Sequence, residues 1–375
     1  NFLESIAYLA TARSLLSLAE RELLHWLAWE EPLPFARLAG DLVRDGRRVK
    51  VEMALVANGS GAPGQRLRKE VRINGVPRRA LDLVGQMPTV LFLPQDIELV
   101  AGAPGIRRRY LDIALCQMQA DYCRALSVYN KALAQRNALL KTLRDRGGSP
   151  DQLEYWDEQL VSCGSLIVAR RAAFLAELEV EANQRQLALT DGRERMHLRY
   201  LPRVAPGQEE MTEEEMDSES GGEPDEAWLQ ARSPVYLAGA APAIADAFRG
   251  ELARIRRREI AAGMSLIGPH RDDVQFIGQG RDLRTYGSRG QQRTAVLSVK
   301  LAEVAVMHRA LAAPPLLLLD DVMSELDAGR RSMLLGALAG VRQAIVTTTD
   351  WDDFTEGFRR AARCLHVIDG RIEAT

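Results

Sequence analysis

The pattern of hydrophobic and polar positions is most distinctive at residues 316–319, where four leucines stand in a row before two aspartates. A strand with one exposed face alternates apolar and polar side chains, so an unbroken apolar run indicates a strand buried on both faces. Residues 90–93 form a second unbroken apolar run, and residues 343–349 are predicted to be a further buried strand that ends in hydroxyl side chains. These segments predict an α/β fold with a parallel core sheet between helices.

Residues 47–76 show a different pattern, with apolar side chains at every second position from Val49 to Met53. This alternation is typical of antiparallel strands. The pair Asn74-Gly75 is a strong signal for a type I′ hairpin turn, and Asp369-Gly370 closes a second hairpin near the end of the sequence.

Residues 110–144 carry apolar side chains every three to four positions, which predicts one long helix. Gly147-Gly148 ends it, and Ser149-Pro150 begins a second helix with a serine cap and a proline in the first turn. A helix of about 35 residues spans only ~50 Å, so we expect a short helical arm rather than a long coiled-coil tether. Further helices are predicted at residues 2–10, from residue 242 onward and at residues 296–311.

The composition is that of a soluble globular protein with room for two domains, at 375 residues with 46% hydrophobic and 27% charged side chains. No uninterrupted apolar run approaches the ~18 residues of a membrane span, and the first residues do not resemble a signal peptide. We therefore expect a cytoplasmic protein without membrane association. The four cysteines lack Cys-x-x-Cys spacing, which argues against a zinc site.

The net charge of −2 is unevenly distributed, because residues 207–226 contain ten acidic side chains and no lysine or arginine. Without that segment the chain would have a net charge of +8, which fits a body that binds a polyanion. The segment has almost no large apolar residues and is predicted to be disordered. It could be a DNA mimic that covers a basic surface or a solvated loop insertion, and the composition favours the insertion.

Two stretches carry candidate chemistry. Asp320 and Asp321 follow the leucine strand, and in open α/β sheets the carboxyl end of a strand is where carboxylates hold magnesium against nucleotide phosphates. Upstream, Ser288, Gly290 and Gln291 open an apolar helix and would offer amides and a hydroxyl to a phosphate. A plain strand with a solvated turn and an ordinary glycine-rich cap are the alternatives.

Several motifs in this order resemble the RecF family of bacterial recombination mediators, whose heads are related to ABC-type ATPases and SMC proteins. The resemblance is carried by residues 92–100, 107–112, 267–273, 286–303 and 316–327. It implies an ABC/SMC-type ATPase head, a mixed sheet with flanking helices, into which an α-helical lobe is inserted.

The resemblance also implies a domain division. Residues 1–104 would form the first part of the ATPase lobe. Residues 105–262 would form the helical lobe with an acidic insertion at 205–230, and residues 263–375 would complete the ATPase lobe.

By the same resemblance, the chain is a DNA-binding ATPase of recombinational repair and replication restart. It would dimerise on ATP, bind double-stranded and gapped DNA, and help load RecA together with RecO and RecR. An ATP-binding subunit of a membrane transporter is the alternative, and a DNA-binding scaffold with a vestigial nucleotide site is a third interpretation.

The cofactors implied are ATP and Mg²⁺, with roles for particular residues. Asp320 would bind the metal, and Asp321 and Gln95 would act on the attacking water. Asp321 stands where related ATPases have glutamate, and displacing a carboxylate by about an ångström can cost ~10²-fold in rate, so a slow ATPase is expected. The remaining nucleotide contacts implied, several of them across a dimer interface, are Ser288, Gly290, Gln291, Asp327, Thr349 and Arg13.

The sequence begins at Asn1 and enters a helical pattern at once. In the family this helix follows the glycine-rich phosphate-binding loop. We therefore expect that the loop lies upstream of the 375 residues and that these residues alone are inactive as an ATPase. A homologue that never had the loop is the alternative.

Two arginine clusters are the candidate DNA contacts. Neither is interleaved with aromatic residues, so phosphate contacts to duplex DNA are favoured over base stacking, and each cluster could equally be a solvated helix face. Within residues 267–273, no chemical role can be assigned to His270, Arg271 or Asp272. The cluster members are Arg107, Arg108, Arg109, Arg254, Arg256, Arg257 and Arg258.

Overall fold

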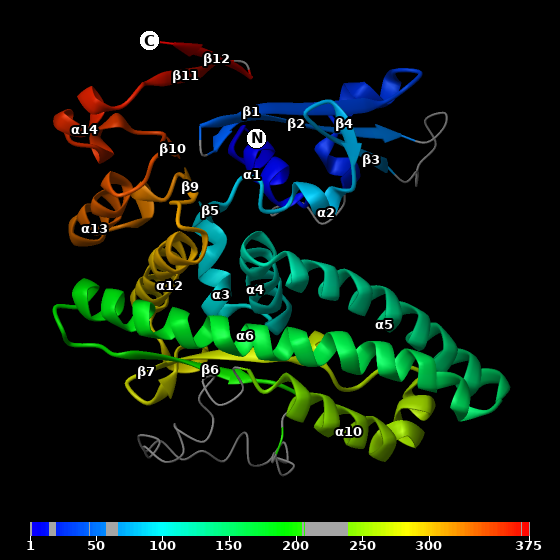
Figure 1. The fold of residues 1–375 in the computed structure, drawn as a ribbon. Helices are drawn as coiled ribbons and strands as arrows, with labels where there is room; N and C mark the ends of the chain where they lie inside the picture. The colour runs from blue at the N-terminus through cyan, green and yellow to red at the C-terminus, as the bar shows by residue number, and fades with distance from the viewer. Residues whose placement is uncertain are drawn as a thin grey trace.

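A computed structural model describes residues 2–14, 20–44, 46–57, 67–204, 206, 239–368 and 370–374. The acidic segment 207–226 and Asp369 lie outside the described residues, so the disorder predicted for the segment stays a prediction. Figure 1 shows two sheets and a terminal β-hairpin in its upper half, and a helical lobe with its own sheet in its lower half.

The leucine strand is the centre of a parallel sheet, as predicted. Strand β9 (Leu316–Asp320) pairs in parallel with β5 (Thr89–Phe92) on one side and β10 (Ala344–Thr347) on the other. Helix α1 (Phe2–Thr11) packs on one face of this sheet, and α12 (Arg289–Leu311) packs on the opposite face. Both faces are covered, which is why the strand needs apolar side chains at consecutive positions.

Beside this core lies a four-stranded antiparallel sheet in the order β1-β2-β3-β4, whose inner face packs on α1. The Asn74-Gly75 hairpin is confirmed, with positive φ of 52° and 78° as a type I′ turn requires. Strand β1 was not predicted, because its outer face also carries apolar side chains at both ends and the alternation is weak. The strands are β1 (Phe35–Arg44), β2 (Arg47–Ala57), β3 (Leu67–Ile73) and β4 (Val76–Arg78).

The helical arm is an antiparallel hairpin of α5 (Ala120–Arg146) and α6 (Glu154–Leu189), with Ser149 accepting a hydrogen bond from the amide of Asp151 at the turn. The single helix predicted at 110–144 is wrong. It is divided into α4 (Pro104–Met118) and α5 by the extended backbone of Gln119, with φ −133° and ψ 102°. The apolar spacing continues across the break, so periodicity alone could not reveal it.

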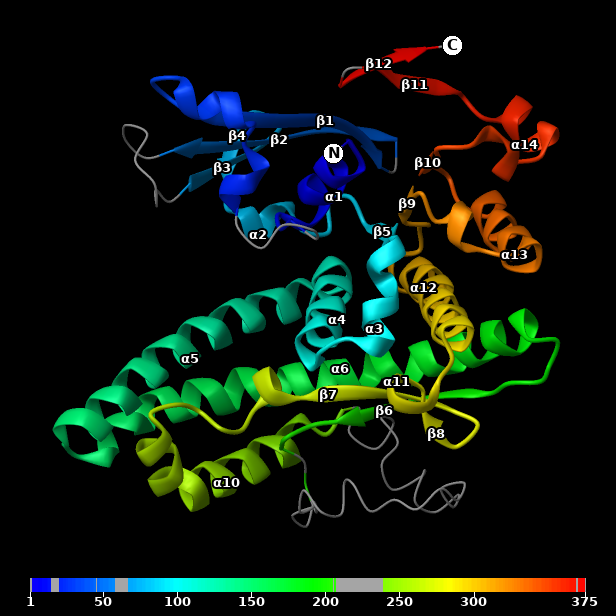
Figure 2. The same ribbon diagram turned by 180° about the vertical axis from the view of Figure 1, so that it is seen from behind.

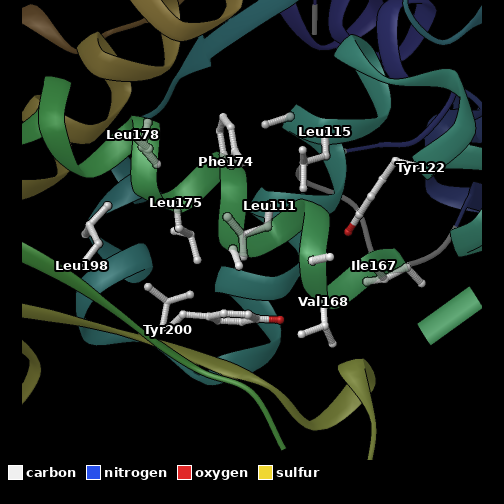
Figure 3. Packing of buried hydrophobic residues seen from close by; sticks show 14 of the residues in the cluster. Leu111, Leu115, Tyr122, Ile167, Val168, Phe174, Leu175, Leu178, Leu198 and Tyr200 are labelled. Carbon is white, nitrogen blue, oxygen red and sulfur yellow. The ribbon is translucent and has the colours of Figure 1, made fainter. Parts of the chain in front are cut away.

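A third helix, α10 (Ala241–Ala262), lies along the arm, and a small antiparallel sheet of β6, β7 and β8 runs beneath α6, as Figure 2 shows from behind. Apolar side chains from the arm and this sheet form one large core, in which Leu175 and Leu178 of α6 lie beside Leu198 of β6 (Figure 3). The strands are β6 (Met196–Leu201), β7 (Asp273–Gly278) and β8 (Arg281–Asp282).

Helix α12 connects the two halves, because some of its side chains enter the arm core and others pack on the parallel sheet. Strand β7 also belongs to the arm core although it follows residue 262, and the predicted division there stays a prediction. The terminal hairpin is present. The remaining elements are α2 (Ala80–Leu83), α3 (Glu98–Ala101), α11 (Leu283–Tyr286), α13 (Ala328–Ala339), α14 (Glu356–Ala361), β11 (Leu365–Ile368) and β12 (Arg371–Ala374).

One helical stretch, Pro150–Leu189, is long and apolar enough by composition to cross a membrane. However, 61% of its most apolar window is buried against other parts of the protein. Its apolar side chains are therefore accounted for by the core of the arm.

Candidate functional site

The carboxyl ends of β5, β9 and β10 meet at one edge of the parallel sheet, where Asp320 and Thr347 are register partners. The hydroxyl of Thr347 donates a hydrogen bond of 2.7 Å to Oδ1 of Asp320. This bond fixes the orientation of the carboxylate. The other carboxylate oxygen makes no hydrogen bond with the residues that the structure describes, so it is available to a hard cation.

Asp321 follows in a conformation that L-residues rarely adopt, with φ of 49°. Its backbone amide is held by the hydroxyl of Thr347 at 3.1 Å, and its carbonyl accepts from the hydroxyl of Ser324 at 2.8 Å. Its side-chain Oδ1 is buried and without a hydrogen-bond partner among the described residues. A buried carboxylate oxygen without a partner costs free energy, and such strain collects at functional sites. Asp320 and Asp321 thus present carboxylate oxygens without hydrogen-bond partners among the described residues at this edge of the sheet.

Gln95 is exposed at the same edge, in a short 3₁₀ turn (Pro94–Ile97) that follows β5. The turn is anchored by the neighbouring Asp96, whose carboxylate accepts from the amide of Leu93 at 2.8 Å. The structure thus brings Gln95, Asp320 and Asp321 to one edge of the sheet, because β5 and β9 are parallel neighbours.

A buried charge cluster beneath this turn was not found from the sequence. Lys300 of α12 pairs with Glu303 at 3.2 Å, and its ammonium lies over the rings of Tyr110 and Phe92 at 5.2 and 5.8 Å. Burial raises the pKa of Asp96 and of Glu303, and the charge of Lys300 partly opposes this. The cluster joins α12, α4 and the turn that carries Gln95. Its only sequence signal is a lysine within the otherwise apolar stripe of a buried helix.

The capping residue and first turn of α12 hold the three residues that were predicted to contact a phosphate, which we call the signature turn (Ser288, Gly290 and Gln291). Ser288 caps the helix. Its hydroxyl accepts from the amide of Gln291 at 3.2 Å, and Oε1 of Gln291 accepts from the amide of Ser288 at 2.9 Å. A Cβ added at Gly290 would meet nothing closer than 3.9 Å, and the backbone there is not in the left-handed region. Neither the packing nor the backbone of this chain therefore requires glycine at 290.

The signature turn does not face the Asp320 edge of its own chain. Twelve residues separate Ser288 from Lys300, where the helix passes Phe92, which is about 18 Å along an α-helix. No hydrogen bond or ion pair joins the signature turn to Asp320, Asp321 or Gln95 within the described residues. The two halves of the site are separate in one chain.

Asp327 lies between the two halves. Its Oδ1 accepts from the amide of Arg330 at 2.9 Å, and Oδ2 pairs with the Arg330 guanidinium at 2.6 Å, which in turn donates to the hydroxyl of Thr294 on α12. Within the chain, Asp327 therefore caps α13. Thr349 is exposed, and its side chain makes no hydrogen bond with a described residue. The threonine that contacts Asp320 is Thr347.

Arg13 is exposed directly after α1. The neighbouring Ser14 accepts a hydrogen bond at its carbonyl from Arg109 and donates one of 2.8 Å to Glu4. The side chain of Arg13 makes no hydrogen bond or ion pair with Asp320 or Asp321 in the described part of the chain, so its predicted nucleotide contact stays a prediction.

Arg107 was predicted to contact DNA, and the structure contradicts this. Its side chain is buried at 3% exposure and forms a bidentate pair with Asp273 at 2.7 and 3.0 Å. It also donates to the carbonyl of Gly102 at 2.8 Å. Arg107 joins α4 to β7. Arg108 and Arg109 are half-buried and donate to the carbonyls of Asp272 and Ser14.

The second cluster on α10 is more exposed. Arg254 pairs with Glu251 on the same helix, and Arg256 pairs with Asp157 of the arm at 3.1 Å. Arg257 and Arg258 are exposed and make no ion pair with a described residue. They remain the predicted DNA contacts with the fewest internal partners.

Asp272 and His270 belong to a buried polar network. Asp272 is fully buried and accepts from the hydroxyl of Tyr200 at 2.5 Å, from the amide of Arg203 at 2.8 Å, and from the buried Arg171. Nδ1 of His270 lies 2.7 Å from the hydroxyl of Tyr129. Burial lowers the pKa of His270 to about 4. These residues tie the arm helices to the strand that follows them, which is a structural role.

The 375 residues contain no glycine-rich loop with the Gly-Lys-Ser/Thr ending that cradles nucleotide phosphates. Among the described residues, no cluster of three histidine, cysteine or acidic side chains is dense enough to hold a metal alone. Asp320 would thus be one ligand of a magnesium ion whose other ligands come from elsewhere, as is usual when the ion is bound together with nucleotide.

Comparisons with known proteins agree on one family. No family model matches the chain. It is 38% identical over 383 residues to the DNA replication and repair protein RecF of Chloroflexus aurantiacus, covering 100% of this chain and 90% of the relative. RecF of Bacillus subtilis is 33% identical over 374 residues, with 99% and 90% covered. A solved structure of the recombination mediator protein RecF with ATP in the RecFOR pathway has a TM-score of 0.79 at 27% identity, covering 100% of this chain and 87% of its own.

Proposed function

The chain belongs to the RecF family of DNA replication and repair proteins, and from that premise we propose that two copies hydrolyse ATP between them while bound to DNA. One copy supplies Asp320, Asp321 and Gln95, and the other supplies its signature turn. The observation that carries this proposal is the separation of the two halves in one chain. A signature turn that is preformed, open and about 18 Å along α12 from its own sheet edge is suited to a nucleotide held by a second copy.

Magnesium with ATP supplies charge neutralisation at the phosphates. Asp320 would be a ligand of that ion, held in orientation by Thr347. Asp321, with its unpartnered oxygen, would accept a hydrogen bond from the attacking water. Its side chain is one methylene shorter than the glutamate of related ATPases, which supports slow hydrolysis that times the lifetime of a complex.

RecR and RecO are the protein partners proposed, since solved structures of related RecF chains are described as parts of the RecFOR pathway. Double-stranded or gapped DNA would be contacted through phosphates by Arg257 and Arg258 on α10. A cytoplasmic location fits this role. Neither the comparisons nor the fold support an ATP-binding subunit of a membrane transporter.

The test uses an extended chain, which is this chain fused at its N-terminus to a glycine-rich phosphate-binding segment that ends in Gly-Lys-Ser/Thr. We expect slow, magnesium-dependent ATP hydrolysis and ATP-dependent dimerisation. Asp320→Asn should lower hydrolysis by at least ~10²-fold, because a metal ligand is lost. Hydrolysis at an unchanged rate in Asp320→Asn would contradict the assignment. A chain that binds DNA but never hydrolyses ATP would support the scaffold interpretation instead. The unextended chain is expected to be inactive alone.

A further inference from the structure

The side chain of Gln291, the third residue of α12, is held from outside its own helix. Its Nε2 donates a hydrogen bond of 3.1 Å to Oε1 of Glu194, a residue 97 positions earlier in the chain. Its Oε1 is occupied by the amide of Ser288. A carboxylate is therefore the acceptor for a side-chain donor of the signature turn.

Glu194 is itself fixed in place at the end of the arm. Its Oε2 accepts from Nε2 of Gln186 at 3.4 Å, and its backbone amide donates to the hydroxyl of Thr190 at 3.1 Å. Gln186 also accepts from the hydroxyl of Ser298 on α12 at 2.8 Å. Helix α6 and the turn that follows it thus hold α12 at two levels, and Figure 1 shows the crossing of α6 and α12.

The charge of Glu194 bears directly on the proposed reaction. The amino end of a helix carries a partial positive charge and favours an anion. In the chain alone, the carboxylate of Glu194 is the anion that contacts Gln291. A nucleotide phosphate on a second copy would approach the same donor with more negative charge, and two anions at one donor repel each other.

We propose that Glu194 is a positioning residue that holds Gln291 ready while opposing the arrival of the second copy's nucleotide, so that its charge sets how tightly ATP joins two copies. This inference rests on the proposed function, because it assumes that the signature turn acts across a dimer. In that dimer the phosphate replaces Glu194 as the acceptor for Nε2 of Gln291. If Glu194 only supported Gln291 through their hydrogen bond, removal of its charge would not tighten the association of the two copies.

The experiment tests the 375-residue chain as it is, with a second copy that only holds nucleotide. The holder is the extended chain carrying Ser288→Arg, which blocks its own signature turn. With ATP and Mg²⁺, association can then occur only through the signature turn of the unmodified chain. ATP binding by the holder is first verified alone, and association is measured by sedimentation velocity at several salt concentrations.

Glu194→Gln in the unmodified chain keeps an oxygen that can accept from Gln291 but removes the charge. We expect about tenfold tighter association at low salt, because the substitution removes the repulsion between the Glu194 carboxylate and the phosphate. The gain should shrink as the salt concentration rises, because salt screens that repulsion. Glu194→Ala removes both the charge and the hydrogen-bond acceptor, so its comparison with Glu194→Gln separates the effects of the two on association. The matched control is Glu181→Gln, since Glu181 also links α6 to α12, through Arg309 at the other end of the helix. It should change association by less than twofold.

The outcomes distinguish a failure of the proposed action across a dimer from a failure of the inference about Glu194. If the wild-type chain does not join the ATP-loaded holder, the proposed action across a dimer fails. If the wild-type chain joins the holder, but Glu194→Gln associates no more tightly than the wild type and Glu194→Ala associates more weakly, Glu194 acts only through its hydrogen bond and the inference is overturned. An effect of Glu194→Gln that does not depend on salt would overturn it as well.

Discussion

The hydroxyl of Thr347 donates to Oδ1 of Asp320 across two parallel strands, at 2.7 Å, and accepts from the amide of Asp321 at 3.1 Å. One threonine therefore orients the carboxylate assigned to the metal and fixes the backbone of the residue assigned to the water. These bonds depend on the register of β9 and β10, in which Thr347 stands opposite Asp320.

Thr347→Val keeps the shape of the side chain and removes both bonds. Because a hydrogen bond to a charged group contributes about 1.5–3 kcal/mol, we expect hydrolysis by the extended chain to fall by about tenfold or more. Thr349→Val is the matched control, since Thr349 is exposed and its side chain has no partner among the described residues. Steady-state hydrolysis should distinguish them, and a larger loss in Thr349→Val would restore the predicted nucleotide contact of Thr349.

This pair of threonines shows where sequence reasoning reached its limit. The leucine strand, its parallel neighbours and the carboxylates at its end could be predicted, because burial on both faces leaves a local apolar pattern. Which of three consecutive threonines faces Asp320 depends on strand register, and a shift of one residue turns every side chain to the other face. Nothing local in residues 347–349 decides that register.

The burial of Arg107 could have been predicted from the helical spacing of the residues around it. Leu111 and Leu115 follow it at intervals of four on α4, so all three lie on one face of the helix, and that face is buried. A run of three arginines on a helix cannot be one surface, because successive side chains point about 100° apart. The contact of Glu194 with Gln291, by contrast, joins residues 97 positions apart and leaves no local pattern.

The two arginine clusters should behave differently in DNA binding. If Arg257 and Arg258 contact phosphates, changing both to glutamine should reduce the slope of log affinity against log salt by about 1.8, at ~0.9 per contact, regardless of DNA sequence. Changing Lys131 and Lys141 of α5 to glutamine removes the same charge elsewhere on the arm and serves as the control. An equal fall in slope for both pairs would mean that net charge alone is measured.

Arg107→Met should instead act on folding. Breaking a buried ion pair leaves Asp273 without its partner, which is expected to cost about 3 kcal/mol of unfolding free energy in a urea titration. The salt slope of DNA binding should stay unchanged under conditions where the variant is folded. A reduced slope with unchanged stability would return Arg107 to the DNA surface.

His270 should make the protein less stable in mild acid. Its pKa is about 4 in the folded chain, because burial and the neighbouring arginines disfavour the charged ring, against an ordinary value of 6.5. Above pH 6.5 the ring is neutral in both states and contributes no pH dependence. As pH falls from 6.5 toward 4 the unfolded chain takes up a proton that the folded chain does not, so stability is lost, by about 1–2 kcal/mol down to pH 5.

Urea unfolding at pH 6.5 and 5.0 measures this loss, which should be smaller in His270→Gln than in the wild type. His197 provides a control of opposite sign, because its bond to Glu179 raises its pKa, and its contribution is present at low pH and lost as pH rises. His197→Gln should therefore increase the loss of stability on acidification. Identical pH dependence in wild type and His270→Gln would show that His270 is protonated in the fold.

Gly290 offers the sharpest separation of folding from function. The chain itself does not require glycine there, since an added Cβ meets nothing within 3.9 Å and φ is ordinary. Gly290→Ala should leave the free energy of unfolding unchanged or raise it by up to about 0.5 kcal/mol, because glycine lowers helix stability.

The added methyl group at residue 290 would nevertheless stand on the open side of the signature turn, where a second copy's phosphate must approach the backbone closely. ATP-dependent association should therefore weaken by at least about tenfold, measured with the extended Ser288→Arg holder. Gly250→Ala in α10, also with open space around the added Cβ, should stabilise the fold without affecting association. A Gly290→Ala chain that associates as tightly as the wild type would mean that the second copy's phosphate does not approach the backbone at residue 290.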